Sequence, residues 1–225
     1  MSEHETGHVH GAPAVAEAGA SSTTFHLLFT LAFFGALGGA ILAYTYQKTL
    51  PAIEKFAGEK VEGAVREVLR SPARLDTLYL VGDKLAKTPP AGVGIGDATK
   101  IFIGYDAAGA RIGVAVDEKA PGFADDVHLM VGFDPATSAL TGFKVLSMKE
   151  TPGLGDKIEK DTTFAPRFKD KVAPLKGTKS VTTDKSTVQT ITGATISSKA
   201  VIKVMNKAVA TWQPRLAAYS KEGGQ

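Results

Sequence analysis

The sequence predicts an α+β protein: a single N-terminal transmembrane helix, then a domain in which a mostly antiparallel sheet packs against a C-terminal helix. Residues 18–47 contain no Asp, Glu, Lys or Arg. Short segments between 77 and 150 are rich in β-branched and aromatic residues and are separated by turn residues. An apolar helical period follows over 196–212. A run of strands followed by a helix is typical of the α+β class.

The charge-free segment has the length and composition of a membrane span. Its centre is FHLLFTLAFFGALGGAILAYTY, residues 25–46, which as a helix is about 33 Å long and crosses a bilayer core. Tyr44 and Tyr46 stand where interfacial aromatic residues gather. A cleaved signal peptide is disfavoured, because no basic residue precedes the span and the span is too long for such a peptide. We therefore expect a membrane anchor.

The flanks of the span define its surroundings. Residues 1–24 are rich in Ala, Gly, Ser and Thr, and we expect a disordered tail. His4, His8 and His10 lie there, but their spacing in a flexible tail does not define a metal site. No Lys or Arg precedes the span, whereas several follow it over 48–70. Taken literally, the positive-inside rule places the C-terminal side in the cytoplasm.

Composition excludes several classes of function. The 225 residues contain no cysteine, so disulfides, thiolate metal sites and cysteine nucleophiles are absent. Lys and Arg number 26 against 23 Asp and Glu, and a net charge of +3 gives no reason to expect nucleic acid.

The remaining chain is predicted in three parts. Residues 47–98 form a membrane-proximal helix and linker region, with a helix over 50–71 bounded by prolines, a strand over 77–81 and a Gly-rich loop over 89–97 that lacks the Lys-Ser/Thr pair of a nucleotide loop. Residues 99–213 form the main domain, and residues 214–225 a C-terminal tail. The predicted strands of the main domain are 100–106, 111–119, 127–134 and 140–150, followed by the helix 196–212. His128 falls in a strand without an obvious acidic partner, so we expect a structural role.

A cluster of hydroxyl residues stands where the last helix begins. The stretch QTITGATISSKAV, residues 189–201, contains Thr190, Thr192, Thr195, Ser197 and Ser198. Free N–H groups and the dipole at a helix N-terminus favour an anion, phosphate above all. Gly193 and Ala194 leave room for it. Helix capping by Thr192 or Thr195 is the alternative, because capping needs only one hydroxyl.

Two motifs resemble a known family. TGATISSKAV resembles the flavinylation motif of FMN-bearing domains, and MKETPGLGDKI, residues 148–158, resembles the segment that lies beside the flavin in those domains. Their order behind a single span is similar to that in the G subunit of the Rnf complex. The related C subunit of the sodium-pumping NADH:quinone oxidoreductase has the same layout. The resemblance covers about residues 27–213.

The resemblance implies a covalent FMN, joined by a phosphoester to Thr195 and attached by a flavin transferase. The other cofactor-binding residues that it implies are Thr192, Gly193, Ala194, Ser197, Ser198, Glu150, Thr151, Leu154 and Gly155. Glu150 is equally consistent with a surface charge at a strand end. The sequence departs from the family at Gln189, where an Asp is usual. No catalytic residue and no metal ligand is implied.

The resemblance also implies a function and a location. The subunit would transfer electrons in an inner-membrane complex that couples ferredoxin and NAD redox chemistry to ion translocation, beside other membrane and iron–sulfur subunits. Its single-pass topology would place the C-terminal domain in the periplasm, against the literal charge rule. The alternatives are an FMN subunit of a quinone-linked sodium pump or other extracytoplasmic reductase, and a membrane-anchored binding or assembly domain without a redox role.

Overall fold

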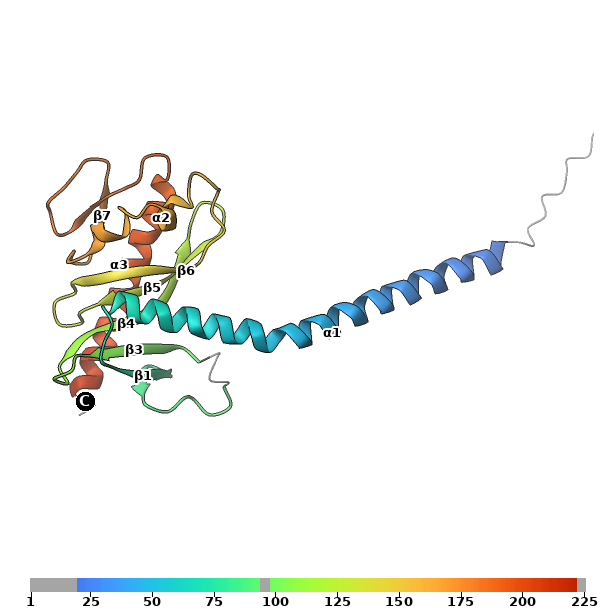
Figure 1. Cartoon of the computed structure of the whole chain (residues 1–225), viewed down its shortest axis with the longest axis horizontal. Helices are drawn as coiled ribbons and strands as arrows, with labels where there is room; N and C mark the ends of the chain where they lie inside the picture. The colour runs from blue at the N-terminus through green and yellow to red at the C-terminus, as the bar shows by residue number, and fades with distance from the viewer. Residues whose placement is uncertain (1–19, 94–97, 222–225) are drawn as a thin grey trace, which may run out of the picture. The chain divides into compact units, whose positions relative to one another are not determined.

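A long helix and a sheet domain make up the described part of the chain. The computed structural model describes residues 20–93 and 98–221, and the chain divides into two units, residues 1–55 and 56–225. The helix α1 (Ala20–Val68) contains 49 residues and contributes to both units (Figure 1). The predicted fold class is confirmed: one N-terminal apolar helix precedes an antiparallel sheet and a C-terminal helix.

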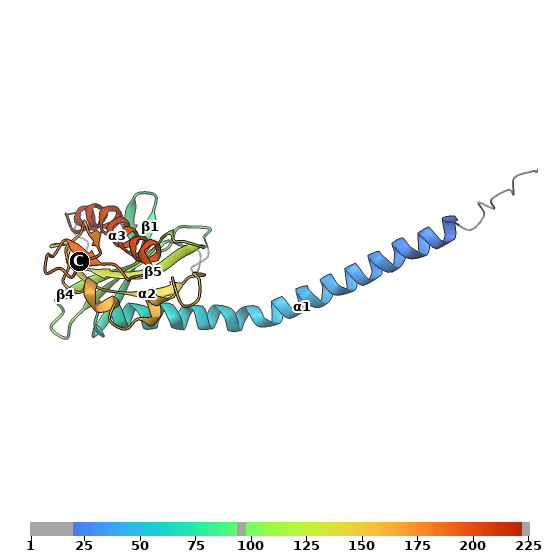
Figure 2. The same ribbon diagram turned by 90° about the horizontal axis from the view of Figure 1, so that it is seen from above.

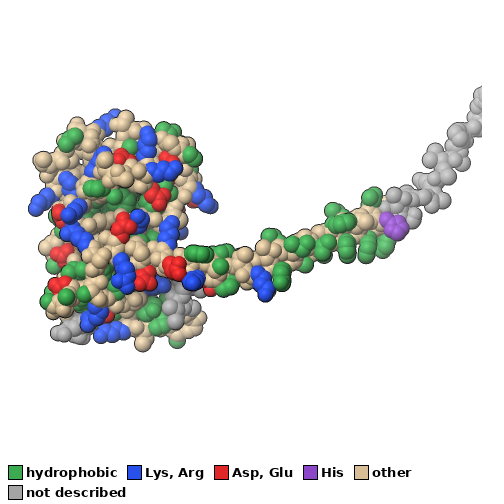
Figure 3. Space-filling model, viewed as in Figure 1, with side chains coloured by type: hydrophobic (Ala, Val, Ile, Leu, Met, Phe, Trp, Pro, Cys, Tyr) green, Lys and Arg blue, Asp and Glu red, His purple; other side chains and the backbone are tan. Residues whose placement is uncertain are grey.

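In the first unit, α1 is apolar and long enough to cross a membrane. Its large side chains over 25–46 are exposed, and Figure 3 shows hydrophobic side chains along this stretch. The helix begins at Ala20, inside the range predicted as a tail, and residues 1–19 of that tail lie outside the described residues. It also continues through Pro51, where the sequence predicts a new helix. An interior proline removes one helical hydrogen bond and can kink a helix without ending it.

The second unit is built on one six-stranded sheet in the order β2-β1-β3-β4-β5-β6. Every pair of neighbouring strands is antiparallel. The strands are β1 (Arg74–Val81), β2 (Lys84–Ala86), β3 (Lys100–Tyr105), β4 (Arg111–Pro121), β5 (Asp126–Phe133) and β6 (Leu140–Ser147). Because β1 pairs with β3, the predicted domain boundary at residue 99 falls inside the sheet.

The two faces of the sheet bury different side chains. Strand residues alternate between faces, so that Val116 and Val131 join the core beneath the C-terminal helix, whereas Ala115 and Met130 point the other way. The end of α1 covers this second face through Val65 and its neighbours. Figure 2 shows the sheet between these helices.

The C-terminal helix, α3 (Thr195–Lys221), is longer than predicted. The sequence predicts a tail after residue 213, but the helix continues through Pro214 to Lys221. The apolar contact of Leu216, which is 2% exposed, fixes this last part to the core. Arg215 adds an ion pair to Asp83 at 3.1 Å.

Short elements connect β6 to α3. They are the helix α2 (Lys157–Lys160), the 3₁₀ helix η1 (Ala165–Phe168) and the parallel strands β7 (Lys176–Thr178) and β8 (Thr187–Gln189). Phe143, Phe164 and Phe168 pack edge to face, with ring centroids 5.1 to 6.1 Å apart. This aromatic cluster holds the connection against the sheet.

Candidate functional site

A cavity of about 280 Å³ lies where the turn after β4, the loop after β6 and the start of α3 meet. Its lining residues are Phe123, Glu150, Thr151, Leu154, Gly155, Gly193, Ala194, Thr195, Ile196 and Ser197. The fold thus brings together the two sequence motifs, which are far apart in the chain, through their residues 150–155 and 193–197. Thr192 and Ser198, which the resemblance also implies, are not among the lining residues.

The start of α3 presents backbone donors to this cavity. Gly193 has φ 83°, a left-handed conformation that glycine adopts without a steric penalty, and the helix begins two residues later. The N–H of Ser198 donates to the carbonyl of Ala194 at 2.9 Å, so the N–H groups of Thr195 to Ser197 precede the first helical bond. No acidic residue lies in this first turn. The arrangement favours an anion.

Two members of the hydroxyl cluster have structural partners. Thr190 Oγ1 donates to the carbonyl of Thr178 at 3.1 Å. Ser198 Oγ, which is fully buried, accepts the N–H of Ile191 at 3.1 Å. Both side chains fix the backbone ahead of α3, and Ser198 serves the fold in the way that capping hydroxyls do.

The other hydroxyls divide between the cavity and the surface. Ser197 Oγ donates to Glu150 Oε2 at 2.6 Å. Thr195 is half-buried and lines the cavity, and within residues 20–93 and 98–221 its hydroxyl has no hydrogen-bond partner. Thr192 is exposed beside the cavity lining. Within the hydroxyl cluster, Thr195 is therefore the member whose hydroxyl the fold leaves available inside the cavity.

Glu150 is part of the cavity wall, and its side chain is only 8% exposed. Oε1 accepts the N–H groups of Phe123 at 2.8 Å and Ala124 at 3.3 Å, while Oε2 accepts the hydroxyl of Ser197. A surface charge at a strand end would be solvated instead. The alternative of a solvent-exposed charge is therefore wrong.

The loop after β6 forms the facing wall. Its turn is closed by the N–H of Leu154, which donates to the carbonyl of Thr151 at 3.1 Å. The side chain of Leu154 stays 49% exposed at the cavity. Gly155 is buried and packs against Glu150, so that an added Cβ would lie only 2.4 Å from Glu150 Oε2.

Sequence reasoning missed two apolar members of the lining, Phe123 and Ile196. They are 65% and 54% exposed, and together with Leu154 they line one cavity, so they form a contiguous apolar patch of the kind that marks a binding site. The helical period places Ile196 in the buried stripe, but the start of α3 turns it toward the cavity. Phe123 stands in a turn outside both motifs, so no sequence pattern signals it.

Gln189, the departure from the family motif, is half-buried at the end of β8. Its Nε2 donates to the carbonyl of Lys179 at 3.2 Å. Its own carbonyl accepts Arg167 Nη1 at 3.2 Å. The residue is not part of the cavity lining.

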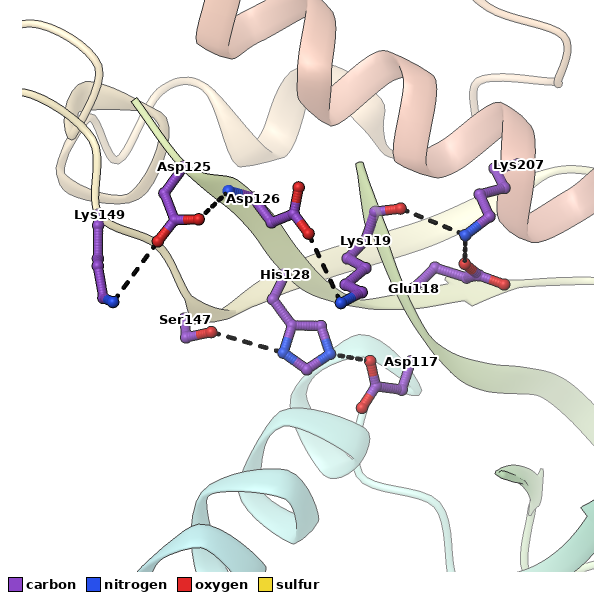
Figure 4. Close-up of polar contacts among 9 residues, drawn as sticks. All are labelled: Asp117, Glu118, Lys119, Asp125, Asp126, His128, Ser147, Lys149 and Lys207. Atoms are coloured by element: carbon purple, nitrogen blue, oxygen red, sulfur yellow. Dashed lines mark hydrogen bonds and ion pairs between the residues drawn. The ribbon is translucent and has the colours of Figure 1, made fainter. Parts of the chain in front are cut away.

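His128 has an acidic partner after all, which corrects the sequence-based expectation. Its Nε2 contacts Asp117 Oδ1 on the neighbouring strand β4, and its Nδ1 lies 3.5 Å from Ser147 Oγ (Figure 4). The hydrogen bond to Asp117 raises the pKa of His128, and partial burial opposes this effect. None of these side chains lines the cavity.

The cavity chemistry suits a phosphorylated aromatic ligand. Helix N–H groups and the hydroxyl of Thr195 supply donors for phosphate, and exposed Phe123, Leu154 and Ile196 supply apolar contacts for a ring. Among the described residues, no group of His, Asp and Glu is arranged to bind a metal. The residues present thus fit FMN.

Comparisons with known proteins agree with this assignment. Residues 122–210 match the model of the FMN-binding domain family. A fold similarity links the chain to the crystal structure of Shewanella oneidensis NqrC, with a TM-score of 0.52 at 18% identity, covering 68% of this chain and 88% of that one.

Relatives share most of the length of the chain. The G subunit of the ion-translocating oxidoreductase complex of Methanosarcina acetivorans is 29% identical, over 81% of this chain and 91% of the relative. The G subunit of the Na⁺-translocating ferredoxin:NAD⁺ oxidoreductase complex of Acetobacterium woodii is 28% identical, over 84% and 91%. The G subunit of the ion-translocating oxidoreductase complex of Aliivibrio fischeri strain MJ11 is 31% identical, over 80% of this chain and 85% of the relative. This chain belongs to the family of G subunits of ion-translocating oxidoreductase complexes.

Proposed function

We propose that the chain carries FMN on Thr195 through a phosphoester and transfers electrons within a membrane complex of the Rnf type. The observation that carries the proposal is the available hydroxyl of Thr195 in the cavity at the start of α3. A flavin transferase would supply FMN activated as a phosphoanhydride of a flavin dinucleotide. The P–O bond of the anhydride breaks, the Thr195 oxygen bonds to the FMN phosphorus, and the nucleoside monophosphate leaves with the hydroxyl proton. Relative to Thr195 and free FMN, the product has lost one water.

The residues around Thr195 have separate tasks in this proposal. The N–H groups of the first helical turn bind the phosphate oxygens, and Gly193 and Ala194 let the phosphate approach the backbone. Thr151 and Leu154 contact the flavin from the facing loop. Ser197 and Gly155 shape the wall between them. Thr192 remains exposed beside the site, and Ser198 acts through the backbone that it holds.

FMN supplies the redox chemistry, since flavins accept and donate electrons, and the protein sets the position of the cofactor and its electrostatic surroundings. This chain needs no general base or nucleophile for the electron-transfer step. A covalent tether keeps the cofactor on the protein where free FMN is absent. The partners would be the other membrane and iron–sulfur subunits of the complex.

The apolar part of α1 would anchor the subunit, and we assign the sheet domain to the periplasmic side of the inner membrane. The lysines after the span oppose this orientation. The positive-inside rule, however, applies to short loops, whereas large domains cross the membrane largely regardless of their charge.

Substitution of the acceptor threonine tests the proposal. The full chain, Thr195→Ala, Thr195→Ser and Thr192→Ala are each co-expressed with a matching flavin transferase, and flavin fluorescence is recorded in denaturing gels. We expect fluorescence in the wild type and Thr192→Ala, and none in Thr195→Ala. Thr195→Ser keeps a hydroxyl and should retain part of the signal. Fluorescent Thr195→Ala protein would contradict the attachment site.

A further inference from the structure

We propose that Glu150 is the positioning residue of the flavin site. Its carboxylate fixes the turn after β4, its own loop and the start of α3 against one another, and it places a negative charge in the cavity wall. The inference rests on the proposed function, because it assigns Glu150 a role toward the FMN on Thr195. It also makes predictions about the protein without flavin.

Both oxygens of the carboxylate are engaged by other segments. Oε1 accepts the N–H of Phe123 at 2.8 Å and the N–H of Ala124 at 3.3 Å. Oε2 accepts the hydroxyl of Ser197 at 2.6 Å. All of these groups are donors, and the acceptor capacity of a carboxylate matches them. One side chain therefore joins the three segments that form the cavity.

Two glycines leave the space that Glu150 occupies. A Cβ added at Gly122 would lie 2.2 Å from Glu150 Oε1, and one added at Gly155 would lie 2.4 Å from Glu150 Oε2 and 2.7 Å from Ser197 Oγ. Such separations are far below van der Waals contact, so any larger residue would displace the carboxylate. The backbone on both sides is thus built around this side chain.

The hydrogen bond between Ser197 and Glu150 also helps to fix the position of Thr195. Ser197 lies in the same first turn of α3 as Thr195, and its side chain is 2% exposed. By holding Ser197, Glu150 fixes the direction of the N–H groups that would bind phosphate and the place of the Thr195 hydroxyl. Positioning of this kind determines whether a site works, because small displacements weaken it strongly.

The charge of Glu150 has a second consequence. It lines the same cavity as Thr195 and is only 8% exposed, and the interactions of a buried charge are less screened than those of a charge in water. A fixed negative charge beside a flavin disfavours the added electrons. Replacement by Gln removes the charge and retains an oxygen that can accept N–H groups and an amide that can donate to Ser197. Glu150→Gln should therefore keep the geometry and raise the midpoint potential.

The experiment compares five full-length proteins co-expressed with a matching flavin transferase: wild type, Glu150→Ala, Glu150→Gln, Ser197→Ala and Glu159→Gln. Glu159 is an exposed acid on α2 and serves as the control. Intact mass gives the fraction that carries FMN, and redox titration gives the midpoint potential. Circular dichroism and hydrogen exchange at Phe123 and Ala124 are measured on the same variants made without the transferase.

We expect Glu150→Ala to lower the FMN-bearing fraction by about fivefold or more, with Ser197→Ala intermediate and Glu150→Gln close to wild type. Glu150→Gln should have a higher midpoint potential than Glu159→Gln. In flavin-free Glu150→Ala, folded by circular dichroism, the amides of Phe123 and Ala124 should exchange faster. A purely structural role would not shift the potential of the Gln variant.

Other outcomes separate this inference from the proposed function. If the wild type gains no FMN, the proposed function fails, and the exchange data then decide whether Glu150 orders the cavity. If the wild type is loaded and Glu150→Ala is loaded equally, with an unchanged potential in Glu150→Gln, the positioning role of Glu150 is overturned. Unchanged amide exchange in Glu150→Ala would overturn it as well.

Discussion

Single hydroxyls in the stretch 189–201 differ in what they contact, although the sequence presents them as one cluster. Ser198 holds the N–H of Ile191, Ser197 holds Glu150, and Thr195 keeps an available hydroxyl among the described residues. The sequence indicates that the cluster stands at a helix start. The distribution of roles follows from contacts with residues far away in the chain, which no local pattern contains.

Substitution of Gln189 tests whether an acidic residue at this position promotes FMN attachment. We expect Gln189→Asp to gain FMN faster than the wild type, because Asp is the residue that the family resemblance implies at this position, and we propose that the transferase reads it. The change removes the hydrogen bond to the carbonyl of Lys179 and should cost about 1 kcal/mol of folding stability. A time course of intact mass at fixed transferase concentration measures the rate. Gln189→Asn is the neutral control, and equal rates for all proteins would show that the acid is not required.

His128 predicts a pH dependence of stability. Asp117 raises the folded-state pKa of His128, while Lys119 opposes and Asp126 supports the effect. The stabilisation is therefore fully present below the unfolded pKa of about 6.5 and is lost as the pH rises through the folded pKa. The pair is partly exposed, so we expect less than about 1 kcal/mol.

Urea unfolding of the wild type and His128→Gln across this pH range measures the effect. The free-energy difference between them should decrease as the pH rises above about 6.5. Asp117→Asn removes the partner and should abolish most of the pH dependence. Parallel curves for the wild type and His128→Gln would exclude a stabilising role for the protonated pair.

At the scale of elements, the longer strands and the C-terminal helix follow from periodicity. The predicted strand 100–106, for example, is β3, Lys100–Tyr105. The strands β2, β7 and β8 were missed, because each has 3 residues, too few to show a period. The pairing of His128 with Asp117 was missed for another reason: it depends on the register between β4 and β5, and the sequence does not display register.

The sequence predicts a tail from residue 214, but α3 continues through Pro214 to Lys221. We therefore expect side chains in this last part of the helix to contribute to the free energy of unfolding. Leu216 is 2% exposed within the core, so Leu216→Ala should lower the free energy of unfolding by about 2 to 4 kcal/mol. Ser220→Ala, at an exposed position of the same helix, should change it by less than about 0.5 kcal/mol. Denaturant unfolding compares them. Equal stabilities would mean that the last turns of α3 do not pack on the core.

For the whole molecule, the charge rule and the family resemblance indicate opposite orientations, and protease accessibility distinguishes them. In spheroplasts, externally added protease should digest the sheet domain, because we place it in the periplasm. A cytoplasmic protein monitored in the same samples confirms that the membrane is intact. Protection of the domain until the membrane is lysed would contradict the periplasmic assignment and agree with the lysines that follow the span.

We propose that this subunit carries FMN covalently on Thr195, and the mass of the native protein tests this most directly. The most direct measurement is the mass of the protein purified from the membranes of its own host, followed by fragmentation of the tryptic peptide 186–199. We predict one FMN less one water, located on Thr195. An unmodified mass, or a flavin on Thr192 or another residue of that peptide, would rule out Thr195 as the attachment site.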